Sequence, residues 1–260
     1  LQIVALVSWP VTGREGADHR ALLRDALAAG ADVVGGCPHL DEDPEGANEV
    51  LLEIAAETGR RVDLHTDETL DPTVLGLRDL AARVTKSGFS YGVTASHCVS
   101  LGMQPVGVQR DVAAEVAAAG VGVVTLPQTN LYLQGRDARV ATPRGLTAIR
   151  ALLDAGATVA GGADNLQDPF NLVGRGDPLE TAALLVMAGH LQPDEAYEAV
   201  SGASRAVLGL PPVAVAPGSP AELLAIRAQT LREAIGSASA ERVVIHRGRV
   251  VSRTRVMTEP

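Results

Sequence analysis

With 260 residues, 46% of them apolar and only 2% aromatic, the chain can bury a sizeable core built mainly from Ala, Val, Leu and Gly. Its formal net charge of −9 argues against nonspecific nucleic-acid binding, and it has no run of about 18 apolar residues to span a membrane. Cys37 and Cys98 are isolated and no segment reads as a signal peptide, which together predict a reduced, cytoplasmic protein.

Apolar runs that predict buried strands alternate with segments of helical periodicity. The strands are expected at residues 1–7, 31–36, 61–65, 92–97, 121–126 and 157–164. In "HRALLRDALAAG", for example, leucines and alanines recur at helical spacing and a glycine offers the C-cap. Strand, helix and glycine-ended turn recur about every 30 residues, which is typical of right-handed βα units in a parallel sheet.

A doubly wound sheet and a (β/α)8 barrel both fit this rhythm. A nucleotide-binding doubly wound sheet carries a GxGxxG or GxxxxGK[ST] motif after its first strand. The corresponding segment here, "VALVSWPVTGREG", contains neither motif. Polar residues instead follow the carboxyl ends of several strands, and catalytic groups gathered in this way are typical of the barrel. These residues are Ser8, Trp9, His39, His65, Glu68, His97, Gln128, Asn130 and Asp164. The sequence therefore predicts an α/β fold of the TIM-barrel type, of which six βα units are present.

The two ends of the chain differ from this pattern. Residue 1 lies inside the apolar run "LQIVALV", and six strands are too few to close a barrel, so we expect further residues upstream. From about Pro211 the pattern becomes short strands, with a hairpin expected at "RG" in "ERVVIHRGRVVS" and the helix "TLREAIGSA" before it. We expect a partial barrel at 1–210 and part of a small β-sandwich at 211–260.

Four of the strand-end residues have the chemistry of a hydrolytic metal site. His65 can offer an imidazole and Asp164 a carboxylate to one divalent ion, and this pair of ligands suits zinc and iron alike. Glu68 can carry a proton from the attacking water to a leaving nitrogen. His97 can hydrogen-bond the reacting oxygen and steady the developing charge.

Each of these residues also has a structural interpretation. A single histidine near a strand end is more often a hydrogen-bonded structural residue, and a carboxylate after a strand is often a helix cap. Asp67 fits the cap interpretation, and so does Asp177, which precedes Pro178. A common site is favoured because His65, Glu68, His97 and Asp164 all fall at the same end of successive strands.

At these residues the sequence resembles the amidohydrolase superfamily, and specifically its cytosine deaminase-like branch. The matching segments occur in order: "LQIVAL", "GADVVGGCPH", "VDLHTDE", "VTASHCVSLG", "TNLYLQGR", "GADNLQDPFNLVGRGDPLETA" and "VVIHRGRVV". The resemblance implies a metal-dependent (β/α)8 barrel with a small β-sandwich. It makes His65 a metal ligand, Glu68 the proton shuttle, His97 the histidine beside the reacting water, and Asp164 the metal-bound carboxylate that activates that water.

The chain departs from the pattern of that branch at three places. The HxH motif, which supplies two further metal ligands, is absent here. Either it lies upstream of residue 1, or the protein does not hold the metal in the usual way. Ser8 stands at or near the position of a substrate-reading glutamine, and Asn165 replaces a carboxylate that often follows the metal-binding aspartate. These changes favour a ring other than cytosine, larger or more substituted. The residues expected to bind it are Ser8, Trp9, Gln128 and Asn165.

Three functions remain open at this point. The first is a hydrolytic deaminase acting on a small N-heterocycle such as a pyrimidine or triazine. The second is hydrolysis of a cyclic or N-substituted amide at the same metal site. The third is a non-catalytic protein that binds a heterocycle without a metal. Zinc-dependent nucleotide deaminases of a different fold are excluded, because the H-x-E and P-C-x-x-C signatures are missing. Proteins of the superfamily often form oligomers, so a homo-oligomer is compatible with the resemblance.

Overall fold

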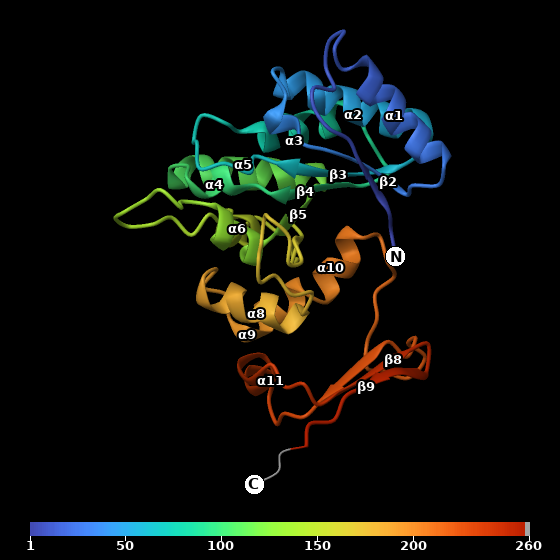
Figure 1. Ribbon diagram of the computed structural model, residues 1–260, viewed down its shortest axis with the longest axis vertical. Helices are drawn as coiled ribbons and strands as arrows, with labels where there is room; N and C mark the ends of the chain where they lie inside the picture. The colour runs from blue at the N-terminus through green and yellow to red at the C-terminus, as the bar shows by residue number, and fades with distance from the viewer. Residues whose placement is uncertain (258–260) are drawn as a thin grey trace.

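The computed structural model describes residues 1–257, and its main feature is a six-stranded parallel sheet whose strands follow one another in chain order (Figure 1). The strands are β1 (Val4–Leu6), β2 (Val33–Gly36), β3 (Arg61–Thr66), β4 (Val93–His97), β5 (Gly122–Thr125) and β6 (Val159–Gly161). Each predicted strand is therefore confirmed. The sequential order, with helices between the strands, is the barrel-type architecture expected from the sequence.

Helices connect the strands and pack on the outside of the sheet. They are α1 (Ala17–Ala28), α2 (Pro44–Thr58), α3 (Gly76–Ser87), α4 (Val99–Gly102), α5 (Val106–Ala119), α6 (Pro127–Leu133), α7 (Ile149–Asp154), α8 (Pro178–Met187), α9 (Pro193–Ala199) and α10 (Gly202–Val207), with a 3-10 turn η1 (Pro38–Leu40). No helix within residues 1–257 combines the length and apolarity needed to cross a bilayer.

Helix α2 shows how local sequence sets the ends of these helices. The Asp43 side chain accepts a hydrogen bond from the Gly46 N–H, and Pro44 occupies the first turn, where no N–H is needed. Gly59 then ends the helix in the left-handed conformation, at φ 64°. The capping aspartate therefore starts the helix at residue 44, before the apolar periodicity of "NEVLLEIAAETG" begins.

β1 and β6 fall furthest short of their predicted ranges. β1 begins at Val4, and β6 ends at Gly161, before the predicted end at residue 164. Asp164 has φ 64°, which is incompatible with an extended strand. The strand therefore ends before Asp164, and the turn directs the Asp164 side chain towards His65 and His97.

Side-chain alternation along β3 separates the core from the interior of the partial barrel. Val62 and Leu64 are buried in the hydrophobic core. Arg61, Asp63 and His65 alternate with them and line a cavity of about 510 Å³. The same strand thus anchors the helices with one set of side chains and exposes polar groups to the cavity with the other.

The C-terminal portion contains a separate three-stranded antiparallel sheet, in the order β7 (Leu223–Ile226), β8 (Arg242–His246) and β9 (Arg249–Arg253). The predicted hairpin is confirmed, and its turn at Arg247 and Gly248 has positive φ at both residues, as a type I′ turn requires. The predicted helix is α11 (Leu231–Ser237). The boundary at residue 210 and the assignment of 211–260 to a β-sandwich stay predictions, and residues 258–260 lie outside the described part.

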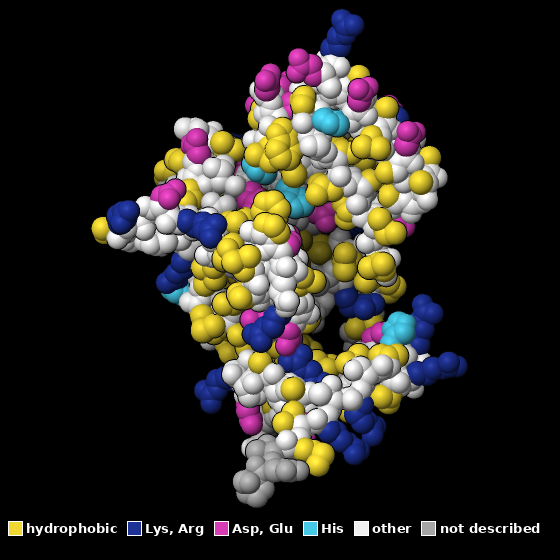
Figure 2. Space-filling view, viewed as in Figure 1, with side chains coloured by type: hydrophobic (Ala, Val, Ile, Leu, Met, Phe, Trp, Pro, Cys, Tyr) yellow, Lys and Arg dark blue, Asp and Glu magenta, His cyan; other side chains and the backbone are white. Residues whose placement is uncertain are grey.

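Charge is unevenly spread over the molecule. Figure 2 shows acidic side chains gathered around the upper helices, and Lys and Arg side chains gathered over the C-terminal sheet. That sheet joins the rest of the molecule through a two-pronged ion pair, in which the Arg242 guanidinium donates to both carboxylate oxygens of Asp177 at 2.9 and 2.8 Å. Asp177 also accepts from the Leu179 N–H, which confirms it as the N-cap of α8.

Candidate active site

Strands β3 and β4 bring two histidine side chains together at their carboxyl ends. The parallel register pairs His65 with Ser96 and Thr66 with His97. His65 faces the cavity by strand alternation, whereas His97 ends its strand with φ 69°. The two rings lie side by side, with their centroids 5.0 Å apart and their planes tilted by 38°.

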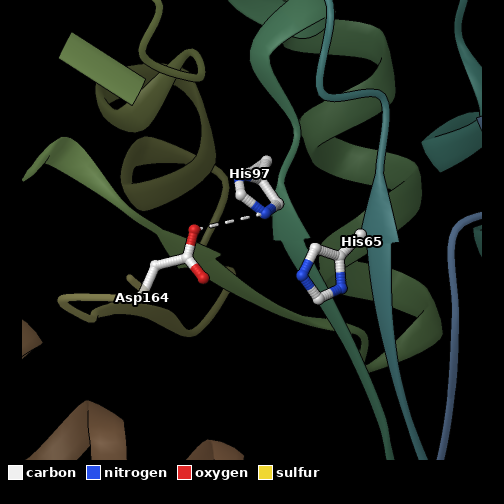
Figure 3. A group of neighbouring side chains, drawn as sticks. All are labelled: His65, His97 and Asp164. Carbon is white, nitrogen blue, oxygen red and sulfur yellow. Dashed lines mark ion pairs between the residues drawn. The ribbon is translucent and has the colours of Figure 1, made fainter. Parts of the chain in front are cut away.

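Asp164 completes a cluster with these histidines. Figure 3 shows His65 and His97, from the neighbouring strands β3 and β4, close to Asp164, which comes from the loop after β6. One ligand atom from each residue lies within 4.8 Å of the others, and Asp164 Oδ2 is 3.8 Å from His97 Nε2. We call these three residues the His–His–Asp cluster. It places two imidazoles and one carboxylate where they can share one divalent ion.

His97 is the most enclosed member of the cluster, with 1% of its surface exposed. Its Nδ1 lies 2.9 Å from Asn130 Oδ1, while its Nε2 has no hydrogen-bond partner among residues 1–257. Burial, together with the neighbouring imidazole of His65, lowers the pKa of His97 to about 3. The ring is therefore neutral, and one of its nitrogens faces the cluster unpaired.

Glu68 reaches the same place from the loop after β3. Its Oε1 lies 3.5 Å from His97 Nδ1, and its side chain is 19% exposed. Burial raises the pKa of Glu68 to about 7, and the nearby negative charge of Asp164 adds to this effect. A carboxyl group with this pKa can both accept and release a proton near neutral pH, as a proton shuttle must.

A buried polar pair lies one layer below the cluster. Asp63 faces the same side of β3 as His65, and its Oδ1 accepts a hydrogen bond of 3.0 Å from the Ser96 hydroxyl on β4. Burial raises the pKa of Asp63. This pair was not among the predicted site residues, although the alternation in "RVDLH" places residues 63 and 65 on one face.

Gln128 and Asn165, predicted to bind substrate, have both of their side-chain amides engaged within the protein. The Gln128 amide donates to the Arg175 carbonyl at 3.4 Å and accepts from the Thr181 hydroxyl at 3.1 Å. The Asn165 amide donates to Asp168 Oδ2 at 2.8 Å and accepts from the Thr129 hydroxyl at 3.1 Å. These contacts fix the loop that follows Asp164, and a direct contact with substrate stays a prediction for both residues.

Ser8 and Trp9, the other two predicted substrate-binding residues, lie in the exposed loop after β1, and Trp9 is 48% exposed. This loop is tied to the loop after β2, because Asp41 Oδ2 accepts the Val11 N–H at 2.6 Å. The loop is therefore held in place without using either side chain. Their contact with substrate also stays a prediction.

Comparison with known proteins agrees with this geometry. Residues 5–252 match the sequence profile described as the amidohydrolase family. A pterin deaminase of Rhizobium rhizogenes is 35% identical over 260 residues, which cover 98% of this chain and 59% of the relative. The chain thus spans less than two thirds of that curated relative's length.

Several solved structures are similar over most of the chain. One is the 5-methylcytosine deaminase of Klebsiella pneumoniae liganded with 5-fluorocytosine, at 30% identity and a TM-score of 0.87, covering 100% of this chain and 64% of the other. The second is the N-isopropylammelide isopropylaminohydrolase of Burkholderia multivorans, at 32% identity and a TM-score of 0.81, covering 97% and 62%. These matches confirm the resemblance drawn from the strand-end motifs: the chain belongs to the amidohydrolase family.

Proposed function

We propose that the protein containing this chain is a metal-dependent hydrolytic deaminase of an amino-substituted N-heterocycle larger than cytosine, and that a pterin is the first substrate to test. The observation that carries the proposal is the convergence of the His–His–Asp cluster with Glu68 at one end of the sheet. The similarity to a pterin deaminase over 98% of the chain supports the choice of ring.

The cluster fits a divalent metal. Its donor atoms lie within 4.8 Å of one another, and His97 Nε2 is buried and has no hydrogen-bond partner within residues 1–257, so its lone pair is free to bind a metal ion. Two imidazole nitrogens and a carboxylate oxygen suit zinc and ferrous iron alike. A bound ion of this kind lowers the pKa of a coordinated water molecule to roughly 7.

The chain's own residues would then handle the protons. The attacking water forms the new C–O bond, and the C–N bond to the amino group breaks. Asp164 Oδ2 accepts the proton that the water loses, and burial favours this because it raises the pKa of Asp164. Glu68 accepts the second proton of the water and passes it to the departing nitrogen, which leaves as ammonia. Asp164 then releases its proton to the ring of the product, so that both carboxyl groups return to their starting state.

The substrate proposal rests on the similarity to a pterin deaminase and on the nature of Ser8. A serine at this position offers one short hydroxyl, whereas a glutamine would offer a donor and an acceptor on a longer arm. A bicyclic aminopyrimidine such as a pterin uses the space that the shorter side chain leaves open.

A second candidate reaction is release of an alkylamine rather than ammonia. It is favoured by the similarity to the N-isopropylammelide isopropylaminohydrolase, at a TM-score of 0.81. Both reactions break a C–N bond at the same cluster, so substrate tests must separate them.

The decisive experiment assays the purified full-length protein, loaded with zinc or with ferrous iron, for release of ammonia or amine. The panel contains pterin, 5-methylcytosine, cytosine and N-isopropylammelide, and the Glu68→Gln variant serves as the control for contaminating activity. We expect about one metal ion per chain and the highest kcat/KM for pterin. A protein that binds no metal, or that releases neither ammonia nor amine from any ring, would contradict the proposal.

A further inference from the structure

Asn130 is a buried side chain directly behind His97. It lies on α6, is fully buried and places Oδ1 2.9 Å from His97 Nδ1. Its Nδ2 donates to the Gly145 carbonyl at 2.8 Å. Both ends of the amide are therefore engaged, one with the site and one with the backbone of a loop.

The Gly145 carbonyl determines which way round the amide lies. A carbonyl oxygen can only accept a hydrogen bond, so the NH2 end of Asn130 must face it. The oxygen end of Asn130 then faces His97 and can only accept, so His97 Nδ1 must carry the hydrogen. In a neutral imidazole the other nitrogen, Nε2, is then a bare acceptor.

We propose that Asn130 is a positioning residue that holds His97 in the Nδ1–H tautomer, so that Nε2 faces the His–His–Asp cluster as an electron-pair donor. Within the described residues this nitrogen has no hydrogen-bond partner, and Asp164 Oδ2, 3.8 Å away, is also an acceptor. Two acceptors facing each other need a metal ion or a water hydrogen between them. The effect of this tautomer on turnover rests on the proposed function, whereas the assignment of the tautomer rests only on the hydrogen bonds of Asn130.

The loop that carries Gly145 is built to hold its carbonyl still. Gly145 has φ 65°, and a Cβ added there would lie 2.5 Å from Gln134 Cβ. The Gln134 N–H donates to the Asn130 carbonyl at 2.9 Å, and Gln134 Nε2 donates to the Glu68 carbonyl at 3.4 Å. The same loop therefore contacts the backbone of Glu68 and sets the orientation of Asn130.

The primary test measures the tautomer in the wild-type protein. Nitrogen NMR of histidine-labelled, zinc-loaded protein distinguishes the two tautomers, and zinc is diamagnetic. The signals of His97 are assigned as those missing from His97→Gln. We expect a protonated Nδ1 and an Nε2 without hydrogen. A hydrogen on Nε2 in the wild-type protein would overturn the proposal, whether or not the protein is a deaminase.

Two variants then test whether Asn130 is the cause. Asn130→Leu fills a similar volume and removes the acceptor, so His97 should lose its preference for the Nδ1–H tautomer. Asn130→Asp keeps an oxygen facing Nδ1 and should retain that tautomer. The matched control is Asn48→Leu, which removes another buried amide, one that bonds to Gly76 and Asp79 instead of to the cluster.

Kinetics with the rings that the wild-type protein turns over provide the second readout. Loss of a hydrogen-bond partner that orients a metal-site histidine typically lowers metal affinity or activity by about 10- to 100-fold. For Asn130→Leu we expect this loss in kcat, with KM nearly unchanged. Asn130→Asp should recover part of the lost kcat. The control Asn48→Leu should leave the tautomer of His97 unchanged. An unchanged tautomer in Asn130→Leu, or equal activity in the leucine and aspartate variants, would refute the positioning role. Absence of turnover by the wild-type protein would refute the proposed function and leave the NMR result to decide the tautomer.

Discussion

Asp67 and Glu68 are consecutive in the chain, yet their carboxylates have separate environments. Asp67 accepts the N–H groups of Gly76 and Leu77 at 2.9 Å each, at the start of α3, whereas Glu68 Oε1 lies 3.5 Å from His97 Nδ1. The positive φ of Asp67, 50°, turns the chain between them. Asp67 therefore caps α3 as expected, although it lies several residues before the helix and Leu75 occupies the N-cap position itself.

Asp67→Ala should destabilise the fold. It leaves two N–H groups unpaired at a site where only 1% of Asp67 is exposed, and each unpaired group costs about 1–3 kcal/mol. Urea unfolding measures the change. Asp71→Ala is the control, because its carboxylate bonds only to nearby Thr73 at the surface. Equal stability of Asp67→Ala and the wild type would show that the two hydrogen bonds do not support α3.

Glu68→Gln should remove most turnover and leave metal binding nearly unchanged. The amide keeps the shape of the carboxyl but cannot cycle a proton, and a proton-transferring group contributes about 10²–10⁴-fold to the rate. Steady-state kinetics and metal analysis of the same preparation measure both quantities. Loss of metal would instead identify Glu68 as a ligand, and full activity would remove it from the mechanism.

The raised pKa of Glu68, about 7, also predicts a pH-dependent change in stability of the metal-free protein. The folded state holds this proton more tightly than the unfolded state, so the carboxyl lowers stability as pH rises from about 4.5 towards 7. The free energy of unfolding of Glu68→Gln should therefore exceed that of the wild type by about 1–2 kcal/mol at pH 8 and equal it at pH 4. Thermal unfolding of both proteins at the two pH values measures this difference. A difference independent of pH would contradict the burial of this carboxyl.

Ser8→Gln should move substrate preference towards cytosine. The longer amide restores a donor and an acceptor for ring atoms, and each restored contact is worth about 1–3 kcal/mol, or a 5- to 150-fold change. The measured quantity is the ratio of kcat/KM for cytosine to that for pterin. Ser90→Gln, an exposed change just before β4 and away from the carboxyl ends of the strands, serves as control. An unchanged ratio would show that Ser8 does not set specificity.

Arg242→Ala should loosen the C-terminal sheet from α8. Arg242 donates two hydrogen bonds to Asp177, which holds the pKa of that carboxyl below its usual value. Hydrogen bonds to charged groups contribute about 1.5–3 kcal/mol, so limited proteolysis should cut the sheet away faster. Arg227→Ala breaks a more exposed pair with Glu241 and should have little effect. Identical digestion of both variants would rule out this anchoring role.

Much of the fold could be predicted from the sequence because its signals are local. The alternation of apolar runs and helical periodicity located all six strands, and the "RG" dipeptide located the hairpin between β8 and β9. The proximity of His65, His97 and Asp164 could also be predicted, because the carboxyl ends of neighbouring parallel strands meet at one face of a barrel. These inferences need only residue order and strand direction.

Other features depend on how distant segments meet. Asn130 is 33 residues from His97 in the chain, and its amide is oriented by a carbonyl a further 15 residues on. Gln128 and Asn165, which the sequence predicts as substrate contacts, also bond to Thr181 and Thr129, two contacts that the sequence does not predict. A polar side chain bonds to whichever partner the packed loops bring within about 3 Å. The sequence thus determined which residues reach the site, but the tertiary structure decided which of their atoms remain free to react, because those atoms are the ones that packing leaves unpaired.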